Sequence, residues 1–238
     1  MLCFSLVIPV FNEEKVVENS IKKVYEKLEE LGYDFEIIVA DDGSTDSTPE
    51  IVGKLQKKYK NLELFRREKN MGRGEILSLA FKVAKGKYIG FTDIDLAVDL
   101  KYLAGLVENL KHGDVATGSR WLQSSKVERG IFRWTISYFY NAFVRRLFNS
   151  KVHDHQCGFK SFRRNAALKL ISECKIKKDR RWAWDTEMLI RAQKHKFKII
   201  EFPVEWTAGK ESRFKLLRDI WIVGSYLIRL YFKEGKIR

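Results

Sequence analysis

The sequence has few cysteines, few prolines and no long hydrophobic run. Its 238 residues include 3 cysteines, at positions 3, 157 and 174, without the paired spacing of a disulfide framework. This usage fits a reducing compartment. The first four residues lead straight into an apolar strand pattern, so we expect no signal peptide. Charged residues interrupt every apolar segment before the ~18 residues that a membrane span needs.

Charge is abundant and unevenly distributed. The chain carries 45 Lys and Arg against 31 Asp and Glu, a net charge of +14. Residues 1–119 hold 17 basic and 20 acidic residues, whereas residues 120–238 hold 28 and 11. The second half should therefore meet something anionic, such as nucleic acid, a phosphorylated substrate or the cytoplasmic leaflet of a membrane. With 45% hydrophobic residues, the chain can bury one sizeable core.

Short apolar strands alternate with amphipathic helices in the first hundred residues. The pattern predicts strands at 4–10, 35–40, 62–66 and 88–92, and helices at 13–31, 48–59 and 74–84. Asn12 is a plausible N-cap for the first helix, and Pro9 and Asn12 should stop the first strand. The alternation predicts an α/β fold with a doubly wound, mostly parallel sheet.

Two acids follow the predicted strand at 88–92. Asp93 and Asp95 are two residues apart, so in extended backbone they would point to the same face. A divalent cation relieves the repulsion of such a pair, and an oxygen-rich site suits Mg²⁺ or Mn²⁺. The carboxyl end of a strand is also where ligands bind in open α/β sheets. The alternative is a loop with two solvated acids.

Two further loops follow predicted strands. Residues 41–46 (DDGSTD) could accept hydrogen bonds from a base or ribose, or could form only an Asx-turn and helix start. A calcium loop is a weaker alternative, because the distal Glu is missing. Residues 69–74 (KNMGRG) precede a helix and could approach a phosphate. They match neither dinucleotide nor P-loop spacing.

These segments together resemble a known family. Residues 5–13 (SLVIPVFNE), 38–46 (IVADDGSTD) and 70–74 (NMGRG), with Asp93 and Asp95, are similar to inverting glycosyltransferases of family 2, which have the GT-A fold. Residues 118–120 (GSR), the spaced Arg133, Ser137 and Asn141, and 154–160 (DHQCGFK) resemble polyprenyl-phosphate glycosyltransferases. Residues 181–187 (RWAWDTE) are similar to the dolichyl-phosphate β-glucosyltransferase branch. Related mannose synthases place Gln where this chain has Ala97.

The resemblance implies a fold and an activity. It implies one GT-A (Rossmann-like) domain over 1–238, with a nucleotide-sugar half at 1–119 and an acceptor-binding, membrane-facing half at 120–238. The enzyme would move a hexose, with glucose favoured, from a nucleotide diphosphate sugar to dolichyl or polyprenyl phosphate, for protein N-glycosylation or other glycan assembly. The donor would be UDP-glucose or, as an alternative, GDP-mannose. Mg²⁺ or Mn²⁺ would be held by Asp93 and Asp95.

The resemblance also assigns roles to individual residues. The nucleotide-sugar site would comprise Pro9, Phe11, Glu13, Val39, Asp41, Asp93, Ile94 and Thr117, with Lys210 and Arg213 over the pyrophosphate. The acceptor phosphate would be held by Arg120, Arg133 and Ser137. Asp185 and Glu187 would act as a base, bind donor hydroxyls or orient a cation. Solvated arginines and helix-start acids are the structural alternatives to these roles.

Two aromatic, basic segments indicate where a membrane could bind. Residues 131–148 and 220–232 are apolar but carry internal arginines, which predicts amphipathic interfacial helices rather than spans. Relatives often have transmembrane helices after the catalytic domain, and this chain shows none. We therefore expect peripheral attachment to the cytoplasmic face. Core-packing amphipathic helices are the alternative.

Other functions remain as alternatives. A zinc site could use His153, Asp154, His155 and Cys157, although no second Cys/His pair stands at finger spacing. A nucleic-acid-binding protein would leave the acid pair unexplained, and no recognised motif supports it, so no nucleic acid is expected. The remaining alternatives are a soluble transferase acting on a saccharide or protein, and a non-catalytic membrane-binding module.

Overall fold

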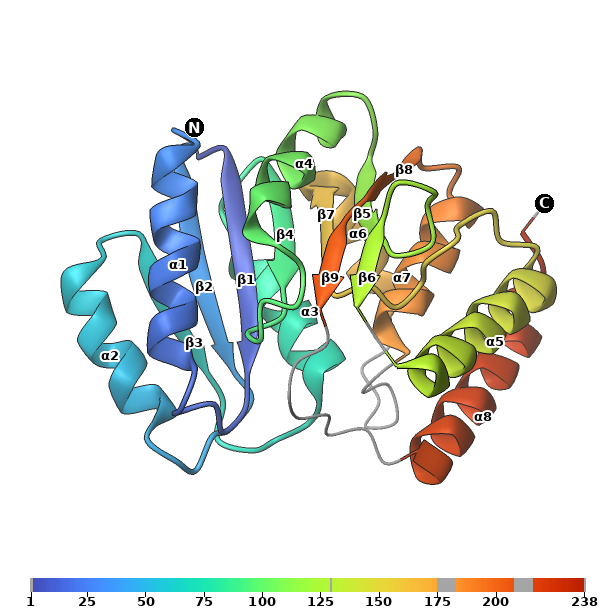
Figure 1. Ribbon diagram of the computed structural model, residues 1–238, viewed down its shortest axis with the longest axis horizontal. Helices are drawn as coiled ribbons and strands as arrows, with labels where there is room; N and C mark the ends of the chain where they lie inside the picture. Colours follow the sequence, from blue (N-terminus) through green and yellow to red (C-terminus); the bar gives the residue numbers. More distant parts are fainter. Residues whose placement is uncertain (1, 129, 175–182, 208–215, 238) are drawn as a thin grey trace.

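A seven-stranded sheet runs through the protein in the order β3-β2-β1-β4-β7-β5-β8 (Figure 1). The computed structural model describes residues 2–128, 130–174, 183–207 and 216–237. The strands of this sheet are β1 (Phe4–Val10), β2 (Phe35–Asp41), β3 (Leu62–Arg66), β4 (Tyr88–Thr92), β5 (Val115–Ser119), β7 (Phe159–Arg163) and β8 (Ile199–Pro203). Only β7 runs antiparallel to its neighbours β4 and β5. The predicted mostly parallel α/β sheet is confirmed.

Helices cover both faces of this sheet. They are α1 (Val17–Glu30), α2 (Thr48–Lys58), α3 (Arg73–Val83), α4 (Leu103–Glu108), α6 (Arg164–Glu173) and α7 (Trp184–Lys194), and two further helices are α5 (Ile131–Phe148) and α8 (Leu216–Glu234). Two 3-10 turns, η1 (Leu100–Tyr102) and η2 (Asn109–Lys111), flank α4. The short strands β6 (Lys126–Glu128) and β9 (Glu205–Thr207) pair separately.

The alternation of side chains along each strand produces two hydrophobic cores. On β1, Phe4, Leu6 and Ile8 pack in the core that also contains apolar residues of α1, α2 and α4. Val7 points to the opposite face, into the core that contains residues of α3, α6 and α7. Because both faces are covered, the central strands are buried throughout, as expected for a parallel sheet.

The first connection differs from the sequence prediction. Helix α1 begins at Val17 rather than at residue 13, and Asn12 does not cap it. Asn12 has a φ of 54°, and its side-chain oxygen instead accepts a hydrogen bond from the Thr45 backbone at 2.8 Å. Pro9 does not stop β1, which continues to Val10. It is tolerated because the pairing of β1 with β4 ends at Val7.

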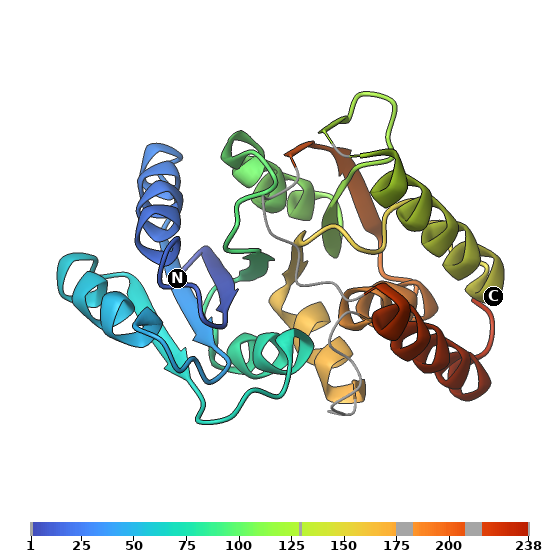
Figure 2. The ribbon, with the colours of Figure 1, turned by 60° about the horizontal axis from the view of Figure 1, so that its bottom comes forward.

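Helices α5 and α8 lie side by side beyond the sheet, next to α7 (Figures 1 and 2). Val144 and Phe148 of α5 pack with Leu227 and Leu230 of α8 and with Ile190 of α7. The remaining surface of α5 is rich in exposed aromatic residues. Among the described residues, no helix is both long and apolar enough to span a bilayer.

Candidate active site

The acid pair lies in a tight turn at the carboxyl end of β4. The extended backbone predicted here is wrong: the Leu96 amide donates to the Asp93 carbonyl at 3.2 Å, and Leu96 has a φ of 50°. The Ala97 amide donates to Asp95 Oδ1 at 3.2 Å. Surrounding protein desolvates the Asp95 carboxylate, and the Asp93 charge adds repulsion, so the pKa of Asp95 is raised. The two carboxylates therefore do form one electrostatic unit.

Arg73 joins this pair to the start of α7. Its Nε donates to Asp93 Oδ1 at 2.8 Å, and its Nη1 donates to Asp185 Oδ2 at 2.7 Å. Burial opposes the charge of Arg73, but Asp185 and Asp93 outweigh it and raise the Arg73 pKa. Asp185 Oδ1 is buried and accepts no hydrogen bond from the described residues. A buried acceptor of this kind is open to a substrate hydroxyl.

Residues 157–160 lie next to the Asp93 carboxylate. A Cβ on Gly158 would lie 1.8 Å from Asp93 Oδ2, so only glycine leaves room for the carboxylate. Lys160 on β7 is fully buried, and its ammonium donates to the Cys157 carbonyl. Its positive charge helps to lower the pKa of Asp154, and it opposes the rise that burial causes in the pKa of Asp185. This segment therefore holds the acid pair and supplies a buried cation.

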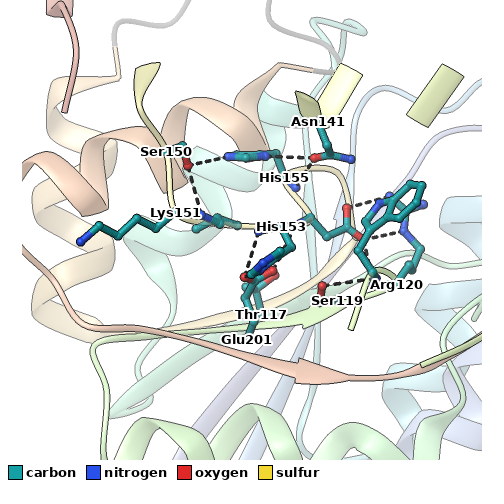
Figure 3. Close-up of polar contacts among 12 residues, drawn as sticks. Thr117, Ser119, Arg120, Asn141, Ser150, Lys151, His153, His155 and Glu201 are labelled. Atoms are coloured by element: carbon teal, nitrogen blue, oxygen red, sulfur yellow. Dashed lines mark hydrogen bonds and ion pairs between the residues drawn. The ribbon is translucent and has the colours of Figure 1, made fainter. Parts of the chain in front are cut away.

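Arg120 is held by a buried carboxylate after β5 (Figure 3). Its Nε and Nη2 donate to Asp154 Oδ2 and Oδ1 at 2.7 and 2.9 Å. Burial alone would raise the pKa of Asp154, but the Arg120 charge holds it well below its usual range. Burial opposes the charge of Arg120, but Asp154 outweighs it and raises the Arg120 pKa, with a smaller contribution from Asp93.

The zinc alternative for residues 153–157 is wrong. His153 Nδ1 contacts Glu201 Oε2 at 2.8 Å, while His155 contacts Ser150 Oγ at 2.9 Å and Asn141 Oδ1 at 3.0 Å (Figure 3). Burial lowers the pKa of His155 to about 3, so this imidazole is neutral. Across the part of the chain that is described, no three His, Cys, Asp or Glu side chains converge on one ion.

Hydrogen bonds join the loops that follow β1, β2 and β3. The backbone amides of Asn12 and Glu13 donate to Ser44 Oγ at 2.9 Å and Thr48 Oγ1 at 2.8 Å. Asp42 accepts hydrogen bonds from the amides of Met71 and Gly72 at 3.1 and 2.7 Å. Hydrogen bonds within the protein thus fix the loop of residues 41–46, which excludes the calcium-loop alternative for the described chain.

The residues predicted to bind the nucleotide lie on or just after β1, β2, β4 and β5. Pro9, Val39, Ile94 and Thr117 are buried, whereas Phe11 and Glu13 are partly exposed. Asp41 ends β2, accepts a hydrogen bond from the Ser44 amide at 2.9 Å and pairs with Arg66 Nε at 3.1 Å. Its carboxylate is therefore held in a fixed orientation.

The remaining predicted residues are less tightly grouped. Arg133 is exposed on α5, one turn from Ser137, whose hydroxyl is buried with no recorded hydrogen-bond partner. Glu187 accepts a hydrogen bond from Arg191 Nη2 on its own helix at 2.9 Å. It also accepts one from Tyr226, so its carboxylate faces α8. Lys210 and Arg213 lie outside the described residues.

Two carboxylates are enough for the predicted metal. Magnesium usually keeps several waters and binds one or two carboxylates together with substrate phosphates, rather than a cage of protein ligands. The charges of Asp93 and Asp95 repel each other across this turn, and Ala97 offers no side-chain ligand. Such a pair fits a hard divalent cation.

Sequence reasoning missed Arg73, Gly158 and Lys160 as site residues. Arg73 and its partner Asp185 are 112 residues apart, so spacing along the chain carries no signal of their contact. Arg73 lies in segment 70–74, and Gly158 and Lys160 lie in segment 154–160. The resemblance of these two segments to the family was the signal that could have identified the three residues.

Comparison with known proteins gives a consistent set of relatives. The model of the family described as "Glycosyl transferase family 2" matches residues 5–171. The chain is similar to "Glycosyltransferase AglD" of Haloferax volcanii, with 40% identity over 233 residues that cover 96% of this chain and 37% of the relative. It is similar to a dolichyl-phosphate beta-glucosyltransferase of Dictyostelium discoideum, with 30% identity covering 96% and 74%. The human protein of that name is 31% identical over 88% and 68%.

Solved structures show the same fold. A glucosyl-3-phosphoglycerate synthase from Mycobacterium tuberculosis, in complex with Mn²⁺, UDP and phosphoglyceric acid, aligns with a TM-score of 0.69 at 18% identity, covering all of this chain and 80% of that chain. TarS of S. aureus aligns with a TM-score of 0.59 at 21% identity, covering 98% and 73%. The predicted GT-A fold is confirmed.

Proposed function

The chain belongs to glycosyl transferase family 2, and from this premise we propose that it moves glucose from UDP-glucose to a polyprenyl phosphate such as dolichyl phosphate, with inversion at the sugar. The product would feed protein N-glycosylation or related glycan assembly. The names of the Dictyostelium and human relatives support glucose as the sugar and dolichyl phosphate as the acceptor. The chain spans only 37% of the archaeal relative, so that protein's full activity is not carried over.

The observation that carries the proposal is the meeting of opposite charges at the carboxyl edge of the sheet. Asp93 and Asp95 follow β4 there, Arg73 Nε donates to Asp93 Oδ1 at 2.8 Å, and Arg120 follows β5 beside Asp154. A transferase that joins a diphosphate donor to a phosphate acceptor needs both signs of charge side by side. The acids would hold a cation, and the arginine would attract an anion.

We assign the metal to Asp93 and Asp95, as Mg²⁺ or Mn²⁺. When bound, the ion would offset the negative charge that builds up on the departing nucleoside diphosphate. The Mn²⁺ in the mycobacterial complex supports this assignment. Arg73 already neutralises part of the charge of Asp93, and its contact with Asp185 keeps both carboxylates oriented.

The acceptor phosphate has to be positioned for the reaction, but it does not have to be deprotonated by the protein. A phosphate monoester has a second pKa of about 6, so the nucleophilic oxygen is already ionised near neutral pH without a general base. Arg133 and Ser137 share one face of α5, and Ser137 offers a buried hydroxyl. Together with Arg120 they would hold this anion. Asp185, which orients Arg73 in the structure, would bind donor hydroxyls with its second oxygen.

The nucleotide would bind to the three hydrogen-bonded loops that follow β1, β2 and β3. Pro9, Phe11, Glu13, Val39, Asp41, Ile94 and Thr117 would form this pocket, with Lys210 and Arg213 over the diphosphate. UDP in the complexes of the structural neighbours supports a uridine donor. Ala97 in place of Gln favours the glucosyltransferase branch over GDP-mannose.

We also propose attachment to the cytoplasmic face of a membrane, through residues 120–238. Helix α5 carries exposed aromatic residues beside Arg133 and Arg146, the composition of an interfacial helix. This half of the chain holds 28 basic against 11 acidic residues, which favours an anionic surface.

A panel of donors and acceptors tests the activity. The purified protein is incubated with labelled UDP-glucose or GDP-mannose, with dolichyl or shorter polyprenyl phosphates, and with Mg²⁺, Mn²⁺ or a chelator. We expect labelled glucose in an organic-extractable product that mild acid cleaves, and no product with the chelator. Preference for GDP-mannose, or transfer only to a water-soluble acceptor, would contradict the proposal.

Replacing Arg133 tests the acceptor site. A lost charge-assisted hydrogen bond costs roughly 1.5–3 kcal/mol, so Arg133→Ala should raise the KM for polyprenyl phosphate roughly tenfold to a hundredfold. The KM for the sugar nucleotide should not change. Arg146→Ala is the matched control, because it removes the same charge from an exposed position on α5. Unchanged lipid kinetics in Arg133→Ala would remove this residue from the site.

A further inference from the structure

A small cavity opens between α5 and the segments that follow β5 and α5. Its volume is about 130 Å³, several times the space that one water molecule needs. Its lining residues are Trp121, Tyr138, Asn141, Arg145 and His153. None of them is assigned to the nucleotide, metal or acceptor site described above.

Arg145 is the charged group of this cavity that lacks a partner. Among the described residues, no atom accepts a hydrogen bond from its buried Nε, and no acidic side chain forms an ion pair with Arg145. The nearby acids are already engaged: Glu201 accepts hydrogen bonds from the backbone amides of His153 and Asp154 and contacts His153 Nδ1, while Asp154 holds Arg120.

Asn141, another polar side chain of the wall, already has hydrogen-bond partners. Asn141 donates to the Ser137 carbonyl at 2.9 Å and accepts from the His155 amide at 2.9 Å (Figure 3). The cavity therefore presents an uncompensated guanidinium, with its buried N–H still to be satisfied. Arginine matches phosphate oxygens well, and a buried donor is costly to leave unpaired.

This cavity lies on a different flank of α5 from the candidate active site. Tyr140 marks the active-site flank, because its hydroxyl contacts Thr186 Oγ1 at 2.6 Å at the start of α7. At about 100° per residue, Arg145 is turned about 140° from Tyr140, whereas Arg133 is turned only about 20°. The phosphate that fits beside Arg145 is therefore not the one placed at Arg133.

The surroundings of the cavity indicate which phosphate would reach it. Trp134 and Tyr138 stack at 5.4 Å with a 6° angle between their rings, and Trp121 contacts both. Nearby on α5, Ile131, Phe132 and Phe139 are 85%, 64% and 65% exposed. Apolar and aromatic residues with arginines beside them match the interface of a bilayer, where lipid phosphates lie at the depth of the aromatic rings.

We propose that the cavity beside Arg145 binds the phosphate of an anionic phospholipid headgroup and thereby docks α5 on the membrane in one orientation. The inference rests on the membrane attachment proposed above and makes it specific. With the headgroup bound at this flank, the flank with Arg133, about 120° around the helix, would remain open to the acceptor lipid. Binding of the headgroup does not depend on which sugar donor the protein uses.

Vesicle flotation with a matched pair of variants tests the proposal. Vesicles contain phosphatidylcholine alone or mixed with phosphatidylglycerol. Arg146→Gln removes one surface charge and should weaken binding to the mixed vesicles roughly fivefold, for about 1 kcal/mol of long-range attraction. Arg145→Gln should weaken it at least roughly tenfold more, because a charge-assisted hydrogen bond is also lost. Equal losses in the two variants would overturn the proposal.

A third variant and a soluble ligand identify the site. Arg145→Lys keeps the charge and should retain most of the preference for phosphatidylglycerol, and unfolding curves show whether each variant is folded. Short-chain phosphatidylglycerol below its micelle concentration should bind the wild-type protein, but not Arg145→Gln. Equally tight binding of inorganic phosphate would indicate a free-phosphate site and overturn the lipid assignment.

Kinetics separate this cavity from the acceptor site. In detergent without phospholipid, Arg145→Gln should keep the wild-type KM for polyprenyl phosphate, and a raised KM would assign the cavity to the acceptor and overturn the proposal. If the wild type transfers no sugar but the two arginine variants still differ in flotation, the headgroup site stands and the proposed transferase activity fails.

Discussion

Asp95→Asn should lower turnover roughly a hundredfold to a thousandfold while leaving the fold intact. The variant removes one of the two charges that we assign to the metal, and electrostatic stabilisation of a departing group by one preorganised partner is worth roughly a hundredfold to a thousandfold. Asp95 lies in a turn at the surface, where its side chain accepts a hydrogen bond from the Ala97 amide, which asparagine can also accept. Turnover and Mn²⁺ affinity are measured across a titration of Mg²⁺ and Mn²⁺.

Asp99→Asn is the control for this experiment. Asp99 is an exposed acid four residues further along, and it accepts a hydrogen bond from the Lys101 amide at 2.9 Å, which asparagine would preserve. It should keep wild-type turnover and Mn²⁺ affinity. Wild-type-like activity in Asp95→Asn at every metal concentration would refute the assignment of this residue to the metal.

Gly158→Ala should be almost as damaging, although it removes no functional group. The added methyl would lie 1.8 Å from Asp93 Oδ2, so the carboxylate has to leave its position and its contact with Arg73 has to change. We expect a loss of turnover of about a hundredfold, with weaker Mn²⁺ binding, because misplacing a catalytic group by about 1 Å can cost that much. Overpacking should also lower the free energy of unfolding by roughly 1–3 kcal/mol.

A second glycine provides the matched control. A Cβ on Gly53 of α2 would meet no atom within 4 Å. Gly53→Ala should therefore leave turnover unchanged, and it should raise the stability by up to about 1 kcal/mol because alanine is the better helix former. If Gly158→Ala keeps wild-type turnover and Mn²⁺ affinity, Asp93 is not held in the position that the structure shows.

The fold was predictable where the sequence signal is local. Strands β1, β3 and β4 have the predicted bounds, because each is a short apolar run between turn residues. The prediction did not extend to β5, β7 and β8. These strands mix polar and apolar residues, and β7 is antiparallel, so neither periodicity nor strand–helix alternation marks them. Helix α5 has the predicted bounds 131–148, since apolar and aromatic residues recur along its whole length.

The candidate site was predictable only in part. The acid pair could be found because both residues stand together at the end of a strand. Their geometry could not, because the turn depends on a hydrogen bond between Leu96 and Asp93 and on a positive φ at Leu96. The orientation of Glu187 toward α8 depends on Tyr226, which is 39 residues away.

The sequence by itself determined the alternating α/β architecture, the acid pair and the basic second half, because each of these is set by residues adjacent in the chain or by composition. Only the tertiary structure decided which charges meet. Arg73 binds an acid 112 residues away, and Arg120 binds one 34 residues away. Gly158 must be small because of a carboxylate on another strand's end. Such contacts depend on how strands and helices pack in three dimensions, and no local pattern encodes them.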